Sequence, residues 1–162
     1  MDTKTQVSVV KDIEVIKPLF EEYVWVMKKY FAVSDEGEWI KRGMEFLDLY
    51  RCEPDRRMYV LTTECGAAAG FALINKNFRV ISQGQSIAEF YIKPDLQKAG
   101  LGKLLATSIF DRHSGIWEVC VTEKNVAGNS FWRRVISSYS GDKYQVNRID
   151  SYDGQVYTFG TA

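Results

Sequence analysis

The chain has 162 residues, with 21 Lys and Arg against 21 Asp and Glu, and therefore a formal net charge of zero. This length suits a single domain with its own hydrophobic core, predicted over residues 1–162, and the balanced charge argues against a general nucleic-acid-binding surface. No apolar run approaches the ~20 residues needed to cross a bilayer, and the polar N-terminus lacks the apolar core of a secretory signal. We therefore expect a cytoplasmic protein with no membrane and no nucleic-acid partner.

Cysteine and histidine usage limits the metal chemistry. The three cysteines, Cys52, Cys65 and Cys120, include no close pair, and His113 is the only histidine. A disulfide framework and a cysteine-based zinc site are both disfavoured by this pattern. We expect no metal site.

The first third of the chain predicts one strand and two helices. Residues 6–10 are rich in β-branched side chains, which is typical of a strand. Apolar side chains then recur at helical spacing after Asp12, a suitable N-cap, although Pro18 leaves open a helix that begins or kinks there. A second amphipathic helix is expected at about residues 38–50.

The middle of the chain predicts three strands. Residues 58–62 and 70–74 are apolar and β-branched and are separated by a turn of small residues, as in a hairpin. After a loop at residues 82–85, a third strand is expected at 87–92, which Pro94 ends.

The last third alternates helices and strands. Helices are expected at residues 102–112 and 127–136, and strands at 116–122, 144–148 and 156–159. The complete order, βααβββαβαββ, predicts an α/β sandwich with a mixed sheet.

The most informative motif joins the third strand to the next helix. Gln97-x-x-Gly100-x-Gly102 places two glycines, which allow a sharp turn, directly before a helix N-terminus. The first N–H groups of a helix have no intrahelical partner and carry the positive end of its dipole, so this geometry suits a phosphate or pyrophosphate. The motif fits neither the P-loop pattern nor the dinucleotide fingerprint.

On these residues the chain resembles the GNAT superfamily of acetyl-CoA-dependent N-acyltransferases, whose pyrophosphate loop reads Gln or Arg, x, x, Gly, x, then Gly or Ala. Asn125 to Trp132 is similar to the second signature of that family, Asn-x-x-Ala-x-x-(Phe/Leu)-Tyr on a helix. The pair Phe131-Trp132 is similar to a subgroup of acetyltransferases with no assigned substrate. The resemblance implies a GNAT-like acyl-CoA N-acyltransferase fold: a mixed, mostly antiparallel sheet with a splayed parallel strand pair and helices on both faces.

The resemblance also implies acetyl-CoA as the acyl donor and a set of residues that bind it. The backbone of the third strand would pair with the pantetheine, the glycine-containing loop would cradle the pyrophosphate, and residues of the last helix would reach the pantetheine arm. These cofactor-binding candidates are Phe90, Tyr91, Ile92, Gln97, Lys98, Ala99, Gly100, Leu101, Gly102, Lys103, Asn125 and Trp132. For Asn125, a simple N-cap role is the alternative.

Glu89 is the candidate catalytic base. In this family an amine attacks the thioester directly, and an alkyl ammonium with a pKa near ~10 must first lose a proton. Glu89 is the acidic residue nearest to the expected reaction point. Because strand side chains alternate between faces, a solvent-facing or paired Glu89 is the alternative.

Two residues depart from the family pattern. Trp132 stands where the family often has a tyrosine that protonates the leaving thiolate, and an indole N–H cannot titrate as an acid. Water, Tyr91 or Tyr139 remain as proton donors. Gly128 replaces a common Ala and is expected to loosen the helix by up to ~1 kcal/mol.

The N-terminal helices are expected to bind the acceptor. Their aromatic and acidic side chains suit a cationic amine through charge and cation–π contacts, with a simple core and a solvated loop as the alternative. These residues are Trp25, Tyr30, Phe31, Asp35, Glu36, Glu38 and Trp39. The sequence thus predicts an N-acetyltransferase that acts on a primary amine, expected to be a small molecule; a non-catalytic acyl-CoA-binding or regulatory module is the alternative. A homodimer is compatible with the aromatic-rich C-terminal strands.

Overall fold

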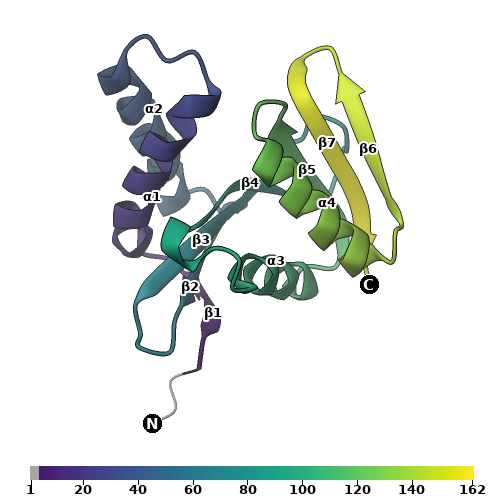
Figure 1. Cartoon of the computed structure of the whole chain (residues 1–162), viewed down its shortest axis with the longest axis horizontal. Helices are drawn as coiled ribbons and strands as arrows, with labels where there is room; N and C mark the ends of the chain where they lie inside the picture. The colour runs from purple at the N-terminus through teal and green to yellow at the C-terminus, as the bar shows by residue number, and fades with distance from the viewer. Residues whose placement is uncertain (1–3) are drawn as a thin grey trace. The chain divides into compact units, whose positions relative to one another are not determined.

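The computed structural model describes residues 4–162, so the first three residues of the predicted domain and of its polar N-terminus lie outside it. Over the described residues, strands and α-helices follow one another in the predicted order (Figure 1). The strands are β1 (Gln6–Val10), β2 (Arg57–Thr62), β3 (Ala68–Asn75), β4 (Gln85–Ile92), β5 (Gly115–Thr122), β6 (Tyr144–Ile149) and β7 (Tyr152–Thr161). The helices are α1 (Ile13–Met27), α2 (Glu36–Asp48), α3 (Leu101–Arg112) and α4 (Val126–Ser140).

The strands form one mixed sheet. Their hydrogen-bonded order is β1-β2-β3-β4-β5-β7-β6. Strands β4 and β5 are parallel, with Gln85 opposite Trp117 and Ile87 opposite Val119, whereas β1/β2, β5/β7 and β6/β7 are antiparallel. The predicted mixed, mostly antiparallel α/β fold is confirmed, and the splaying of β4 and β5 stays a prediction.

The chain divides into two compact units. Unit 1 comprises Met1–Leu73, of which residues 4–73 are described, and Glu89–Leu105. Unit 2 comprises Ile74–Ala88 and Ala106–Ala162. Strands β3 and β4 and helix α3 contribute residues to both units, so the single domain over 1–162 stays a prediction.

In unit 1, helix α1 begins where its cap predicts. The Asp12 carboxylate accepts the backbone N–H of Glu14 at 3.0 Å, and the helix continues through Pro18 to Met27. Asp12 thus sets the start, because Pro18 removes only one hydrogen bond from an otherwise intact helix. Helix α2 lies beside α1 (Figure 1), where the Trp39 indole donates to the Val24 carbonyl at 2.8 Å.

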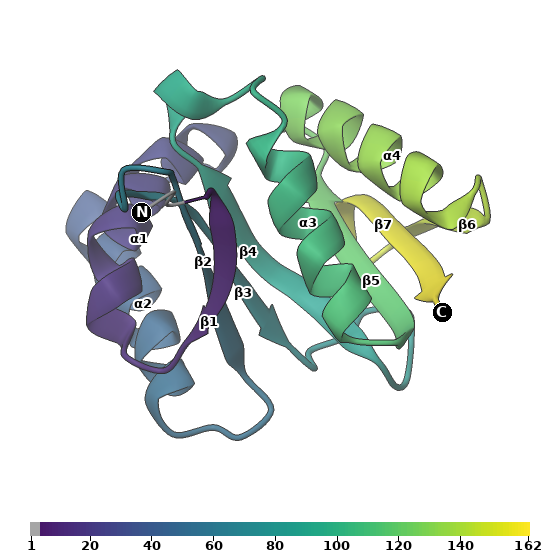
Figure 2. The ribbon, with the colours of Figure 1, turned by 90° about the horizontal axis from the view of Figure 1, so that it is seen from below.

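In unit 2, helix α4 packs on strands β5, β6 and β7 (Figure 2). Fully buried Trp117 of β5 contacts Phe110 with ring centroids 5.0 Å apart, and Phe110 contacts Phe159 at 4.9 Å. Helix α4 is longer than predicted, because it continues past Ile136 until Gly141, whose φ of 60° ends it in the left-handed conformation.

A buried carboxylate organises the connection between β3 and β4. Glu118 of β5 is 0% exposed and accepts the backbone N–H groups of Arg79, Val80 and Ile81 at 2.7, 2.9 and 3.0 Å. The three N–H donors compensate the desolvation of a carboxylate in the interior. The sequence did not predict this role for Glu118.

We expect Glu118→Gln to lower the free energy of unfolding by about 3 kcal/mol. The neutral amide loses the charge-assisted hydrogen bonds, and its NH2 group faces backbone N–H groups that need an acceptor. Urea unfolding measures the difference. Glu123→Gln is the control, since Glu123 is a solvent-exposed partner of Arg148 and exposed ion pairs contribute little. Equal losses in the two variants would contradict the role given to Glu118.

Candidate functional site

The glycine-containing turn of unit 1 joins β4 to α3. After the short 3-10 turn Pro94–Leu96, Lys98 and Gly100 adopt positive φ angles of 69° and 80°. A glycine suits the second position because an added Cβ would be strained there, although space around Gly100 is open. The turn is solvent-exposed and leads directly into the N-terminus of α3.

The first turn of α3 presents backbone N–H groups at the end of the helix. The N–H of Leu104 donates to the carbonyl of Gly100 at 3.1 Å, which starts the helical hydrogen-bond pattern. By helix geometry, the N–H groups of the first turn point out of the helix end, where the dipole is positive. Lys98 and Lys103 flank this end and add positive charge, and both are exposed.

Gln97 supports the turn through a side-chain hydrogen bond. Its side-chain amide donates to the carbonyl of Ile92, the last residue of β4, at 2.9 Å. This hydrogen bond closes the connection between strand and helix. The structure thus gives Gln97 a bracing contact, and its predicted contact with a cofactor stays a prediction.

Glu89 lies in β4 and meets helix α1. The hydroxyl of Tyr23 donates a hydrogen bond to Oε2 of Glu89. Glu89 remains partly exposed, yet the surrounding protein desolvates its carboxyl and raises the pKa from 4.5 to about 7, while the Tyr23 hydrogen bond opposes the rise. A carboxyl with this pKa can accept and release a proton near neutral pH.

The raised pKa of Glu89 makes stability depend on pH. Because the folded pKa of about 7 exceeds the usual 4.5, the folded state binds this proton more tightly, and its stabilising contribution is lost as the pH rises through 7. We therefore expect the stability of Glu89→Gln relative to the wild type to be greater at about pH 8 than at about pH 5. Urea unfolding at both pH values measures this gain, and an equal difference at the two values would contradict it.

Tyr91 lies two residues beyond Glu89, on the same face of β4. Its hydroxyl donates to Oε2 of Glu22 at 3.3 Å, and Lys93 lies 3.9 Å from the other oxygen of that carboxylate. Burial first, and then the charge of Glu22, raise the pKa of Tyr91 to about 12. Tyr91 is therefore a weaker acid than free tyrosine, which does not favour it as a proton donor.

Unit 2 carries the other two cofactor candidates. Asn125 caps α4, since its side-chain oxygen accepts the N–H of Gly128 at 2.9 Å. Trp132 is 6% exposed and packs beside Phe110 and Phe131 with ring centroids 6.4 and 5.0 Å away. Core packing accounts for a large aromatic side chain at 132, and the predicted pantetheine contacts of Asn125 and Trp132 stay predictions.

The presence of glycine instead of alanine at position 128 has a structural reason. A Cβ at this position would lie 2.5 Å from Nδ2 and 2.7 Å from Cγ of Asn125. The glycine at position 128 therefore leaves room for the Asn125 cap, and the capping hydrogen bond offsets the expected loosening of the helix.

We expect Gly128→Ala to give no gain in thermal stability, because the ~1 kcal/mol of helix propensity is offset by displacement of the cap. Thermal unfolding measures this. Ala127→Gly, one residue earlier in the same helix, is the reference for propensity alone. A clear rise in the melting temperature of Gly128→Ala would contradict the crowding argument.

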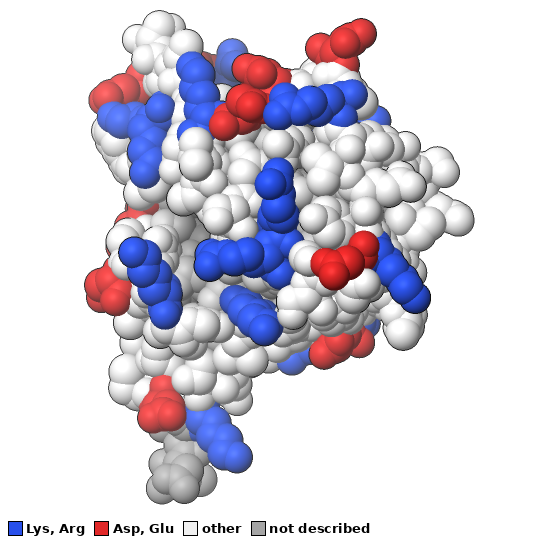
Figure 3. Space-filling model, turned by 45° about the vertical axis from the view of Figure 1, so that its right-hand side comes forward, with Lys and Arg blue, Asp and Glu red and all other residues white. Residues whose placement is uncertain are grey.

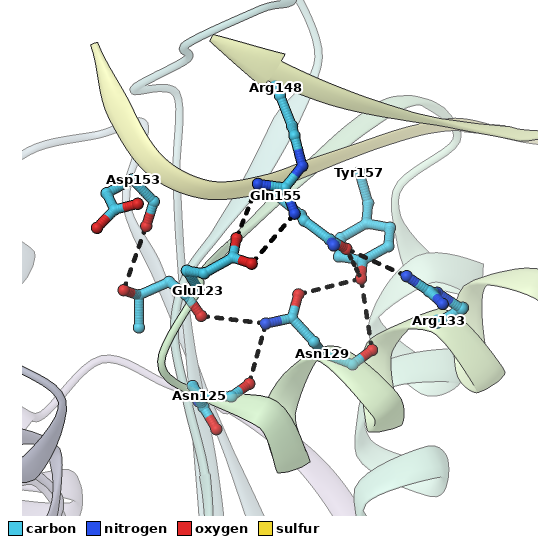
Figure 4. Close-up of polar contacts among 9 residues, drawn as sticks. Glu123, Asn125, Asn129, Arg133, Arg148, Asp153, Gln155 and Tyr157 are labelled. Atoms are coloured by element: carbon cyan, nitrogen blue, oxygen red, sulfur yellow. Dashed lines mark hydrogen bonds and ion pairs between the residues drawn. The ribbon is translucent and has the colours of Figure 1, made fainter. Parts of the chain in front are cut away.

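Asn129 fixes the turn between β5 and α4, and sequence reasoning missed it. Its amide donates to the carbonyls of Thr122 and Asn125 at 3.0 and 2.9 Å (Figure 4). A second asparagine one helical turn after the capping Asn125 was the available signal. Asn129 thereby holds the chain segment that presents Asn125.

The same network continues to β7 and β6. The Tyr157 hydroxyl shares its proton between Gln155 Oε1 at 2.6 Å and Asn129 Oδ1 at 3.1 Å (Figure 4). At the edge of the network, Arg148 pairs with both carboxylate oxygens of Glu123 at 2.9 and 3.2 Å. These contacts tie the start of α4 to the C-terminal hairpin within unit 2.

Tyr139, the second predicted proton donor, also binds a carboxylate. Its hydroxyl donates to Oδ1 of Asp111 at 2.7 Å. Burial first, and then this hydrogen bond, raise the pKa of Tyr139 to about 12. This arrangement does not favour Tyr139 as the acid that protonates a thiolate.

The acidic residues expected to bind a cationic acceptor have partners within unit 1. Asp35 caps α2 by accepting the N–H of Glu38 at 3.0 Å. Glu36 pairs with Lys28, and Glu38 pairs with Arg42. These contacts favour the alternative in which the acids serve the local structure.

The aromatic residues of that group also contact one another and their own chain. Lys28 lies 4.1 Å above the Trp25 ring, and Phe31 and Trp39 have ring centroids 5.4 Å apart. Trp25 and Phe31 nevertheless stay 46% and 44% exposed. Acceptor binding by this group stays a prediction.

Charged side chains and helix lengths are two further features of the described residues. The face in Figure 3 carries side chains of both charges, and several Lys and Arg side chains gather near its middle. Over residues 4–162, none of the helices has the length and apolar character required to cross a membrane.

The structure therefore brings the predicted residues together in two groups. Residues 89–92 and 97–103 lie along one continuous segment of unit 1, and Asn125 and Trp132 lie on α4 of unit 2.

Solved structures share this fold. The N-acetyltransferase PaiA from Thermoplasma acidophilum, solved in complex with coenzyme A, matches with a TM-score of 0.67 and 16% identity over 96% of this chain and 99% of that chain. An acetyltransferase from Thermus thermophilus matches with a TM-score of 0.66 and 15% identity over 99% and 100%. A GNAT-family acetyltransferase from Staphylococcus aureus matches with a TM-score of 0.58 and 9% identity over 96% and 99%.

These likenesses confirm the expected fold class. The chain has the GNAT acetyltransferase fold over nearly its whole length. At such identities the likeness concerns the fold alone. Neither a protein-family model nor a curated protein sequence matches the chain.

Proposed function

We propose that this protein is an N-acetyltransferase that transfers the acetyl group of acetyl-CoA to a primary amine of a small molecule. The observation that carries the proposal is the segment from Glu89 to Lys103. It combines, in unit 1, a carboxyl that titrates near neutral pH with an exposed turn and a helix N-terminus suited to a pyrophosphate.

Each part of the segment has a role in this reaction. The turn around Gly100 and the first N–H groups of α3 would bind the pyrophosphate, and the backbone of residues 90–92 would bind the pantetheine. Glu89 would take the proton from the ammonium, so that the neutral amine attacks the thioester carbon. A backbone N–H of β4 would stabilise the oxyanion, and collapse of the intermediate would release the thiolate.

The second proton, which the attacking nitrogen loses as the amide forms, would pass through water to the leaving thiolate. Tyr91 and Tyr139 donate to carboxylates, and an indole at 132 is no titrating acid. The engagement of both tyrosines with carboxylates, together with the indole at 132, also favours a second candidate function. This is a non-catalytic acyl-CoA-binding module, in which the loop binds the ligand and no acetyl transfer follows.

Thermal unfolding with acetyl-CoA, and with CoA as the comparison, tests the shared part of both candidates. A ligand that binds only the folded state adds about 2.7 kcal/mol at a concentration 100-fold above its dissociation constant. A rise in melting temperature supports the CoA site, and no rise at millimolar ligand would overturn it. Release of CoA thiol with a panel of primary amines then separates the enzyme from the binding module.

A further inference from the structure

Two consecutive residues of α1 hold two alternate residues of β4. Tyr23 donates to Oε2 of Glu89, and Glu22 accepts the hydroxyl proton of Tyr91 at 3.3 Å. Glu89 and Tyr91 are two positions apart and therefore share one face of the strand. All four residues belong to unit 1, so α1 covers the face of β4 that carries Glu89.

The Tyr23 ring is fixed by its surroundings. It is 8% exposed. Its ring centroid lies 5.5 Å from that of Phe71, at an interplanar angle of 90°, and 5.7 and 5.9 Å from those of Tyr91 and Phe20. A ring packed on several sides keeps its rotamer, so the direction of its hydroxyl is set by the core.

We propose that Tyr23 is the positioning residue of Glu89: its hydroxyl binds Oε2 and thereby orients Oε1 as the oxygen that receives the substrate's proton. This inference rests on the proposed function, in which Glu89 is the base. Tyr23 acts through Glu89 and makes no contact with substrate in this role.

The hydrogen bond also sets the charge state of Glu89. The Tyr23 hydroxyl is the donor in this hydrogen bond, because a carboxylate oxygen can only accept. Donation stabilises the carboxylate against the protonated acid and opposes the effect of burial. Among the described residues of unit 1, Glu22 and Tyr91 lie beside this part of β4 and bind each other, and Lys93 lies beside Glu22.

The test is a carbon-13 NMR titration of glutamate carboxyl groups in the folded protein without acetyl-CoA. Loss of one resonance in Glu89→Gln assigns Glu89. In Tyr23→Phe, which retains the ring and removes the hydroxyl, we expect the Glu89 titration to move upward by about one pH unit. Tyr139→Phe is the matched control: it removes a hydroxyl that donates to Asp111 and should leave Glu89 unchanged.

The pH profile of kcat/KM supplies a second readout. Its acidic limb should move upward with the NMR titration in Tyr23→Phe and stay in place in Tyr139→Phe. An unmoved Glu89 titration in folded Tyr23→Phe would overturn the proposal.

The titration needs no turnover, so the two proposals fail separately. If the titration moves but no amine is acetylated, the proposed function fails while the Tyr23–Glu89 linkage stands. If amines are acetylated but the pH profile of kcat/KM is the same in Tyr23→Phe and in the wild type, only the positioning role of Tyr23 is contradicted.

Discussion

Gly100→Asp is expected to abolish acetyl-CoA binding. Gly100 has a φ of 80° and an exposed position directly before α3, where an added side chain meets open space. Aspartate tolerates the left-handed conformation better than most residues, so the fold should survive. Its carboxylate would occupy the helix end proposed for the pyrophosphate and repel it. We expect a loss of at least about 100-fold in affinity, measured by isothermal titration calorimetry.

Gly100→Asn is the matched control. Asparagine has nearly the same size and the same tolerance of positive φ, but carries no charge. It should lose much less affinity than Gly100→Asp, and the difference between the two should shrink at high salt. Equal affinity for acetyl-CoA in the wild type and in folded Gly100→Asp would remove the turn from the binding site.

The order of elements was predictable because it depends on local patterns. Apolar and β-branched runs predicted the seven strands, and helical spacing of apolar side chains predicted the four α-helices, found over residues 4–162. The predicted ends of the elements were less accurate where pairing with a distant strand changed the length of an element. Strand β4 begins at Gln85, within the segment predicted as loop, because pairing with β5 at Trp117 extends it.

The polar contacts that organise unit 2 were not predictable, because their partners lie far apart in the chain. Glu118 binds N–H groups 37 to 39 residues away, and Tyr157 meets Asn129 across 28 residues. Alternation in a strand places Glu118 on one of two faces without saying what covers that face.

Glu89 illustrates the same limit at the proposed reaction centre. The sequence identified the residue but left its strand face undetermined. The contact with Tyr23, 66 residues earlier, shows which face that is. Burial by the surrounding protein raises the pKa of Glu89 to about 7, and the Tyr23 hydrogen bond opposes the rise. A raised pKa arises from burial and tertiary contacts, which no local motif encodes.

Glu89→Gln is expected to lower kcat by at least about 100-fold, the usual contribution of a general base, while acetyl-CoA affinity stays unchanged. Glutamine keeps the shape and can still accept the Tyr23 hydrogen bond, but it cannot take the proton of the ammonium. Because the residual reaction uses amine that is already neutral, its rate should rise with pH up to the amine pKa near ~10. Steady-state kinetics from about pH 6 to about pH 10 measure both effects.

Glu22→Gln separates loss of the base from loss of a neighbouring carboxylate. Glu22 is the next residue of α1 and binds Tyr91 instead of Glu89. Its variant should keep the wild-type dependence of kcat on pH, whereas Glu89→Gln loses the limb near pH 7 set by the Glu89 carboxyl. If folded Glu89→Gln, with its thermal response to acetyl-CoA intact, turns over at the wild-type rate, the base must be another group, and the carboxyl in β4 then serves only the packing of α1 on the strand.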